Sequence, residues 1–152
     1  DMKLNDRITV LFAGLYFSFA CNAIAAGESA FQIENPWVRE APPMASMLAG
    51  YLMIKNTTDS VAMLIGVSSP EFRKVEMHRT EVVNGLARMV RQQSIEVPAN
   101  GVLEFEPGRY HLMLMMPTTP LSAGDTVGFR FEFEGGRSLD VTAPVKRAES
   151  SN

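Results

Sequence analysis

The chain has 152 residues, of which 46% are hydrophobic and 20% are charged, and its formal net charge is −3. This is enough apolar material for one compact domain that buries a core without help from disulfides. The balance is weakly acidic and no stretch is strongly basic, so the composition argues against nucleic acid and against anionic lipid surfaces as partners.

The N-terminal segment has the form of a secretory signal peptide. Lys3 and Arg7 precede an apolar run at 8–20 that is too short to span a bilayer as a stable helix, and Ala23-Ile24-Ala25 has the small-x-small form of a cleavage site. We predict that residues 1–25 are removed and that the mature chain is periplasmic, without stable membrane insertion. Residues 26–145 then form the functional domain, and the polar residues 146–152 form a flexible C-terminal tail.

Cys21 is the only cysteine of the chain and lies inside the predicted signal peptide. It could instead mark a lipoprotein junction, but the preceding Ser18-Phe19-Ala20 lacks the usual aliphatic residue. If the signal peptide is removed, no thiol remains. Because an exported compartment is oxidising, a thiolate metal site there is liable to form a disulfide, whereas thioether and imidazole ligands are not.

From Ala26 onward, short runs rich in β-branched and aromatic residues alternate with turn signals such as Asn84-Gly85 and Gly135-Gly136. No long helical period interrupts them, so the pattern predicts an antiparallel β-sandwich or barrel. In the clearest alternation, Phe129, Phe131 and Phe133 are predicted to face the core. The predicted strands are Phe31–Ile33, Trp37–Arg39, Ala49–Lys55, Val61–Val67, Arg73–Val82, Leu86–Gln92, Val102–Phe105, Tyr110–Met115, Thr126–Phe133 and Ser138–Thr142.

Both histidines of the chain, His78 and His111, lie in one stretch together with Met89 and Met113. Imidazole nitrogens and soft thioethers, which do not ionise, together favour monovalent copper over hard cations. A single His-x-Met is weak evidence in a chain with ten methionines. The hypothesis of a Cu(I) site therefore depends on the joint presence of both histidines, the exported context and the absence of thiols from the mature chain.

The Asn84-Gly85 pair allows a test of whether these ligands converge. A two-residue type I′ turn at this point places Thr80 opposite Met89 and His78 opposite Arg91, so that His78 and Met89 point to the same side of the hairpin. A slip of one residue in the loop would send Met89 to the other side. The predicted register is therefore a requirement for the site.

The second pair of candidate ligands, His111 and Met113, also shares a face, because the two residues lie two apart in a predicted strand. We therefore expect two separate strand pairs to contribute two ligands each. Met115 lies on the face of Met113 and is a spare thioether near the site, whereas Met77 points toward the core with Val75.

The remaining methionines fall into two groups. Met53, Met63 and Met116 are interpreted as core filling. Met44 and Met47 follow Pro42-Pro43 in a predicted loop, where methionines are harder to explain as core, and they are candidates to cap the metal or to contact a partner.

The spacing of ten residues between His78 and Met89, twenty-one between Met89 and His111, and one between His111 and Met113 resembles the H-x10-M-x21-H-x-M signature of the periplasmic PCuAC copper chaperones. The similarity covers roughly residues 31–145. The supporting motifs are Asn35-Pro36-Trp37-Val38-Arg39, Ala41-Pro42-Pro43, Ala49-Gly50-Tyr51-Leu52, Ile95-Glu96-Val97-Pro98-Ala99, Pro107-Gly108-Arg109-Tyr110-His111-Leu112-Met113-Leu114 and Pro120-Leu121-Ser122-Ala123-Gly124-Asp125.

This resemblance implies a cupredoxin-like Greek-key β-sandwich that binds one Cu(I) through His78, Met89, His111 and Met113. It also implies transfer of the ion toward the CuA centre of cytochrome c oxidase, with the CuA subunit or a Sco-type thiol protein as transient partner. Arg109 departs from the family pattern, which commonly has a glycine there, and places a cation beside His111. The sequence has no His- and Met-rich C-terminal tail, so we expect no second copper site of that kind.

Other classes of protein fit the sequence less well. A blue-copper electron carrier requires a cysteine thiolate, and a copper oxygenase with an N-terminal histidine ligand does not match cleavage before Ala26. Neither histidine has a nucleophile motif beside it, so we expect no enzymatic activity. The alternative that stays open is an exported β-sandwich that binds a protein or a small ligand without metal.

Overall fold

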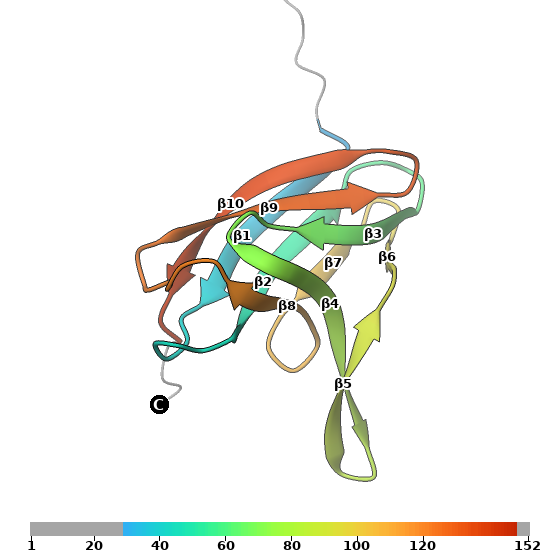
Figure 1. Cartoon of the computed structure of the whole chain (residues 1–152). Coiled ribbons are helices and arrows are strands. Elements are labelled where there is room, and N and C mark those ends of the chain that lie inside the picture. Colours follow the sequence, from blue (N-terminus) through green and yellow to red (C-terminus); the bar gives the residue numbers. More distant parts are fainter. Residues whose placement is uncertain (1–28, 149–152) are drawn as a thin grey trace, which may run out of the picture.

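The structure is a computed structural model, and it describes residues 29–148 (Figure 1). The prediction of a signal peptide at 1–25 falls outside the described residues. Within residues 29–148, no helix is long and apolar enough to cross a membrane. The described chain forms the strands β1 (Phe31–Arg39), β2 (Met47–Asn56), β3 (Ala62–Ser68), β4 (Phe72–Val83), β5 (Leu86–Gln92), β6 (Ile95–Val97), β7 (Val102–Phe105), β8 (Tyr110–Pro117), β9 (Thr126–Phe133) and β10 (Ser138–Lys146).

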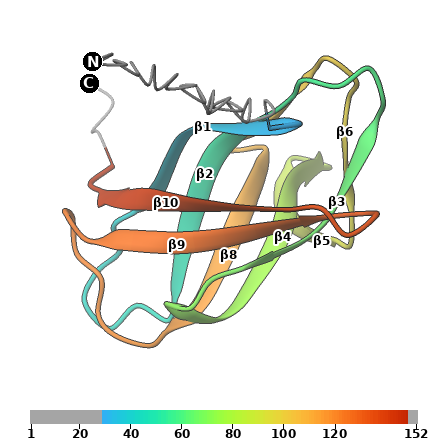
Figure 2. The same ribbon diagram turned by 90° about the horizontal axis from the view of Figure 1, so that it is seen from above.

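The strands are hydrogen bonded in the order β5-β4-β8-β7-β2-β1-β10-β9-β3-β6, with an additional pairing of β8 with β2. This continuous sheet folds over at β1 and β10, so that β9, β10 and β3 form one layer and β1, β2, β8 and β4 form the other (Figures 1 and 2). Most pairings are antiparallel, and the two parallel ones, β1 with β10 and β7 with β8, are short. The predicted all-β sandwich is confirmed.

The core lies between the two layers and joins them. In β9, Val127, Phe129, Phe131 and Phe133 are each at most 3% exposed, as the alternation in the sequence predicted. The ring of Phe133 stacks on that of Phe31 from β1, with centroids 4.0 Å apart. Burial of such side chains contributes roughly 1.5–3 kcal/mol each, so this layer of aromatic residues holds the two sheets together.

Three strand predictions differ from the structure. The two runs predicted around Asn35-Pro36 form one strand, β1, which accommodates these residues as an irregularity with Asn35 at φ 48°. β6 was missed because it has only three residues. β10 extends past the predicted end at Thr142, because Ala143 and Val145 continue the buried side of the strand despite the intervening proline.

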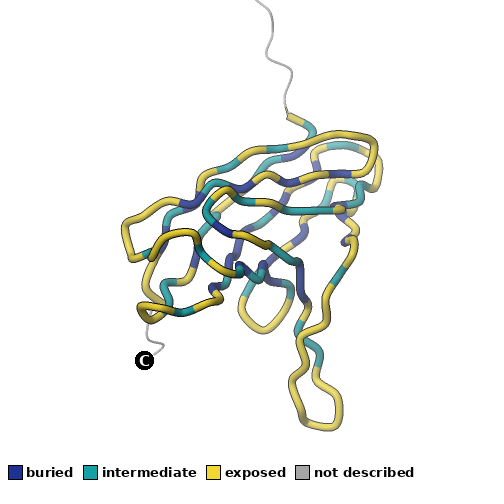
Figure 3. The backbone as a smooth tube through the Cα atoms, in the orientation of Figure 1, coloured by how far each residue is buried: buried dark blue, intermediate teal, exposed yellow. Residues whose placement is uncertain are grey.

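The β4–β5 hairpin extends beyond the body of the sandwich (Figure 1). Every residue of β5 from Leu86 to Arg91 is exposed, and the tip of the hairpin is the most prominent exposed segment in Figure 3. Few tertiary contacts therefore hold this hairpin, and its conformation depends mainly on its turn and on its own pairing.

Candidate metal centre

His78 and His111 lie directly opposite each other on the adjacent strands β4 and β8. Their ring centroids are 5.9 Å apart, and both residues are buried, with exposed fractions of 8% and 6%. Both point to the outer face of the sheet, because their neighbours Met77 and Leu112 point into the core between the layers. The strand period of two thus sends the apolar residues inward and the two imidazoles outward together.

The hydrogen bonds of the two rings determine which nitrogens are free. Nε2 of His78 lies 2.8 Å from Oε2 of Glu76, and Nδ1 of His111 lies 3.2 Å from the carbonyl oxygen of Arg109. An ionised carboxylate and a carbonyl oxygen can only accept, so these two ring nitrogens donate their protons. A neutral imidazole then keeps a lone pair on Nδ1 of His78 and on Nε2 of His111.

Those two remaining nitrogens are buried and have no hydrogen-bond partner in the described part of the chain. A buried polar atom without a partner typically costs about 1–3 kcal/mol, and native folds rarely contain one without a functional reason. In each of the two facing rings, one nitrogen is engaged in a hydrogen bond and the other keeps a free lone pair. This is the arrangement expected for histidines that bind a metal through one nitrogen and are oriented by a hydrogen bond through the other.

Glu76 is a candidate residue of the site that the sequence reasoning missed. Its carboxylate contacts Nζ of Lys74 at 2.6 Å, the ring of His78 at 2.8 Å and Nε of Arg91 at 3.4 Å. The hydrogen bonds from Lys74 and His78, together with the charge of Arg91, lower the pKa of Glu76 to about 2. The sequence contained a signal for it, because Glu76 precedes His78 by two residues in a predicted strand and therefore shares its face.

The predicted register of the β4–β5 hairpin is confirmed. Thr80 pairs with Met89 and His78 pairs with Arg91, and the turn residues Asn84 and Gly85 have φ angles of 51° and 75°. Positive φ at both central residues is what a type I′ turn requires. Met89 therefore lies on the same face as His78, one diagonal step away.

The expectation that the ligands come from two separate strand pairs is wrong. β4 pairs with β5 on one side and with β8 on the other, so all four candidate ligands lie on three adjacent strands of one sheet. The physical reason is that an interior strand has two hydrogen-bonding edges, and residues 77–79 of β4 pair with β5 along one edge and with β8 along the other. Sequence order alone did not show this, because β8 follows two further strands.

The two thioethers stand on opposite sides of His78. Met113 pairs with Glu76 and is diagonal to His78 on β8, whereas Met89 is diagonal to it on β5. On a flat sheet, the Cα atoms of Met89 and Met113 would be roughly 17 Å apart, from a rise of about 3.4 Å per residue and about 4.8 Å between strands. The histidines are thus already together, while Met89, which is 62% exposed, has to reach over from the projecting hairpin.

The other methionines depart in part from the predictions. Met77 is buried in the core, as expected, at 4% exposure. The interpretation of Met53, Met63 and Met116 as core filling is wrong. Met53 alternates with the buried residues Leu52 and Ile54 and therefore points outward, Met63 does the same beside Leu64, and Met116 is 47% exposed.

Two predictions for methionines near the site can be refined. Met115 lies on the face of Met113, as predicted, and Met47 is not in a loop but is the first residue of β2, directly opposite Met115. Within residues 29–148, no group of three or more His, Cys, Asp or Glu side chains is placed to hold a metal ion. The thioethers beside the paired histidines are ligands of a kind outside that set.

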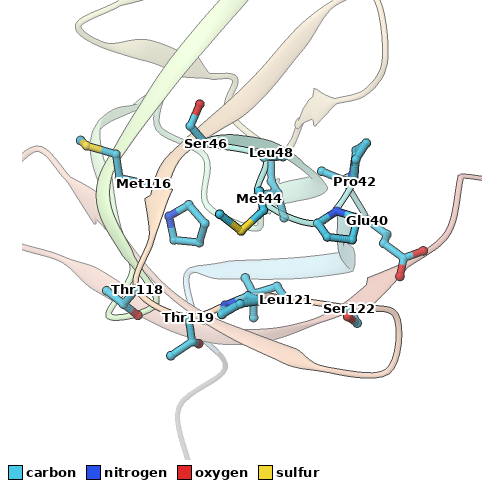
Figure 4. Close-up of a pocket in the computed structure, with 15 residues that line it drawn as sticks. Glu40, Pro42, Met44, Ser46, Leu48, Met116, Thr118, Thr119, Leu121 and Ser122 are labelled. Carbon is cyan, nitrogen blue, oxygen red and sulfur yellow. The ribbon is translucent and has the colours of Figure 1, made fainter.

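A pocket of about 640 Å³ lies apart from this centre, between the segment after β1 and the segment after β8 (Figure 4). Met44, Leu48, Met116 and Leu121 are among the residues that line it. None of the four candidate ligands lines it. The pocket and the candidate metal centre are therefore separate features.

The fold is that of the PCuAC domains, and it agrees with the expected cupredoxin-like Greek-key sandwich. The copper-bound PCuAC domain from PmoF2 superposes with a TM-score of 0.65 at 24% identity, over 78% of this chain and 94% of that domain. The solution structure of CuI-DR1885 from Deinococcus radiodurans has a TM-score of 0.62 at 27% identity, over 88% of this chain and 89% of that one.

By sequence, the chain belongs to the family described as "Putative lipoprotein LpqE-like", which matches residues 31–145. The putative lipoprotein Lxx21020 of Leifsonia xyli subsp. xyli is 31% identical over 80% of this chain and 72% of that protein. The uncharacterized protein RP573 of Rickettsia prowazekii is 30% identical over 78% of this chain and 67% of that protein.

Proposed function

We propose that this protein is an exported copper chaperone that binds one Cu(I) tightly through His78, Met89, His111 and Met113 and delivers it to a partner protein. The observation that carries the proposal is the pair of buried nitrogens, Nδ1 of His78 and Nε2 of His111, which have no hydrogen-bond partner in the described residues. They lie on facing rings whose other nitrogens are engaged. Copper is the cargo of this protein and not a catalytic cofactor.

The donor set supports monovalent copper over other ions. Two neutral imidazoles and two thioethers carry no negative charge and are soft or intermediate donors, which suits Cu(I) and does not suit Mg²⁺ or Ca²⁺. The absence of a cysteine ligand suits an oxidising compartment. Uneven exposure supports transfer, because exposed Met89 is the ligand that an incoming partner can displace first while the buried histidines still hold the ion.

The comparisons support the same assignment. Two structures of similar fold are described as copper-bound and as a CuI form, and the family and one relative carry the name of putative lipoproteins. An exported location is consistent with those names. A lipoprotein would carry its lipid on Cys21. The exported protein is therefore either cleaved before Ala26 or lipidated at Cys21.

The recipient we propose is the CuA centre of cytochrome c oxidase, reached directly or through a Sco-type protein. This part rests on the resemblance of the His78, Met89, His111 and Met113 spacing to that of the PCuAC chaperones. It is tested by mixing the Cu(I)-loaded protein with an apo CuA domain under anaerobic conditions and following the metal. The absence of transfer in this mixture would exclude the direct route. Its absence also in a mixture that contains a Sco-type protein would refute this recipient while leaving the copper site itself in place.

The binding site is tested by anaerobic titration with Cu(I) in competition with a Cu(I)-selective chelator. We expect one tight equivalent for the native protein and its loss in His111→Ala, with circular dichroism unchanged. If the native protein took up no copper, the alternative of a metal-free binding module would replace the proposal. If His111→Ala bound copper as the native protein does, His111 would not be a ligand and the proposed site would be wrong.

A further inference from the structure

We propose that Met47 and Met115, with Met113 as a shared arm, form a second position for a soft monovalent cation on the outer face of the sheet. The position adjoins the proposed copper centre at Met113. The idea that a copper ion passes through this position on its way to the copper centre rests on the proposed function. The capacity of the position to bind an ion rests on the register of β2 and β8 alone.

The register places the thioethers side by side. Met47 on β2 is directly opposite Met115 on β8, and Ala49 is opposite Met113. Side chains directly opposite in an antiparallel pair have Cβ atoms about 4.5–5.5 Å apart, and diagonal neighbours are about 7–8 Å apart, within reach of long side chains. Because Ala49 is small, the space between Met113 and Met47 is not filled by a competing side chain.

The ends of the two strands are held in this register by the backbone. The N–H of Met116 donates a hydrogen bond to the carbonyl oxygen of Ser46, at 2.8 Å, immediately beyond the Met47 and Met115 pair. Met116 adopts a positive φ of 52°, which breaks the alternation there. Its side chain lines the pocket in Figure 4 with Met44 and Ser46. The irregularity begins at Met116, so Met115 keeps its pairing with Met47 and lies on the outer face of the sheet with Met113.

The surface around the pair suits a soft ion and not a hard one. Met47 is 54% exposed, so an ion reaches the pair from solvent. The cross-strand partner of Met115 on its other side is Lys74, whose ammonium is engaged by Glu76 at 2.6 Å. Among the described residues, those paired with Met47 and Met115 include no carboxylate, so this pair offers no anionic ligand to a divalent cation, while neutral thioethers still bind Cu(I) or Ag(I).

The shared arm links the two positions chemically. An ion on Met47 and Met115 can add Met113 as a third thioether, then exchange Met47 for Nε2 of His111 and Met115 for Nδ1 of His78. Every ligand gained or released is neutral, so the ion keeps its charge and no proton is released. The row of methionines thus leads an incoming ion along the outer face toward the buried imidazoles.

The test uses Ag(I), a redox-inert soft cation, added to the full chain with ¹³C-methyl-labelled methionines and followed by NMR. We expect two sequential equivalents, the second shifting the methyl signals of Met47 and Met115. The double variant Met47→Leu with Met115→Leu should lose the second equivalent and keep the first. Met53→Leu is the matched control, because Met53 lies on the same face of β2 opposite Glu104 and Glu34, without a methionine partner, and should keep both.

The same titration separates this proposal from the copper centre. In His78→Ala with His111→Ala, the first equivalent should disappear while the methyl signals of Met47 and Met115 still shift. Retention of the second equivalent in the double leucine variant would overturn the second position, and so would uptake of only one equivalent by the native chain. Failure of the copper centre would appear instead as an unchanged first equivalent in the histidine variant.

Discussion

Replacement of Glu76 by alanine should weaken Cu(I) binding although Glu76 is not itself a proposed ligand. The carboxylate accepts a hydrogen bond from Nε2 of His78 at 2.8 Å and so leaves the lone pair on Nδ1. Without it, the ring can take either tautomer and is no longer held in one orientation. The donor atoms remain, but they are no longer arranged before the ion arrives.

The expected size of the effect follows from that contact. A hydrogen bond to a charged group contributes about 1.5–3 kcal/mol, which corresponds to roughly 10- to 100-fold in affinity, the range typical for loss of an outer partner of a metal ligand. Glu76→Gln keeps an acceptor oxygen but loses the charge that also holds Lys74 and Arg91. We therefore expect a loss of at most about 10-fold for Glu76→Gln and a larger one for Glu76→Ala.

The assay is chelator competition for Cu(I) under anaerobic conditions, with ¹⁵N NMR of the imidazoles to identify the coordinating nitrogens. In the native protein these should be Nδ1 of His78 and Nε2 of His111. Asp140→Asn is the matched control, because it removes one carboxylate from the ion pair with Arg130 in the other layer and should leave the affinity unchanged. Equal affinities of the native protein and folded Glu76→Ala would refute the role of Glu76.

Three further predictions concern the fold that carries the site. Gly85→Ala should destabilise the protein by about 1–2 kcal/mol in urea denaturation, because Gly85 has a φ of 75°, which is strained for alanine. A Cβ at this position would meet nothing within 4 Å, so a steric clash is not the cause. Unchanged stability would contradict the strained turn. Phe131→Ala should cost about 3–5 kcal/mol, since the side chain is fully buried, and a loss below about 1 kcal/mol would show that the layers do not depend on it. In the metal-free protein, the pKa of Glu76, lowered from 4.5 to about 2, gives stability that is complete above about pH 5 and is lost as the pH falls through about 2. The pKa difference corresponds to roughly 3 kcal/mol at most, and solvent screening of the half-exposed Lys74 and Arg91 reduces it to about 1 kcal/mol. The stability difference between the native protein and Glu76→Gln should therefore shrink between pH 5 and pH 2, and a constant difference would argue against the ion pairs.

Much of the local structure was predictable because short-range rules decide it. The Asn84-Gly85 pair specifies its own turn, and the turn then sets the pairing of Thr80 with Met89. The alternation from Phe129 to Phe133 identified the buried side of β9 in the same way. Where the signal was short or interrupted, as at β6 and at the proline in β10, the same rules failed.

The candidate site was only partly predictable. The four candidate ligands and their shared faces follow from spacing and strand parity, so the sequence identified the donors and the kind of ion they suit. Strand parity indicates the outward direction of Met53 between Leu52 and Ile54, and at this position parity is a better guide than the general tendency of methionines to fill cores. The role of Glu76 was missed because a carboxylate in a strand is usually only a solvated residue.

The sequence alone thus determined the class of fold, the hairpin register and the soft donor set, since each depends on residues that are neighbours or lie two apart in the chain. Only the tertiary structure decided that His78 faces His111, that Glu76 and the Arg109 carbonyl leave one lone pair free on each ring, and that Met47 meets Met115. The pairings of His78 with His111 and of Met47 with Met115 join strands distant in the sequence, and they depend on how the whole sheet folds over its core, which no local pattern specifies. The contacts of Glu76 and the Arg109 carbonyl lie within one strand, but strand parity gives only the shared face and not the ring nitrogen that is engaged.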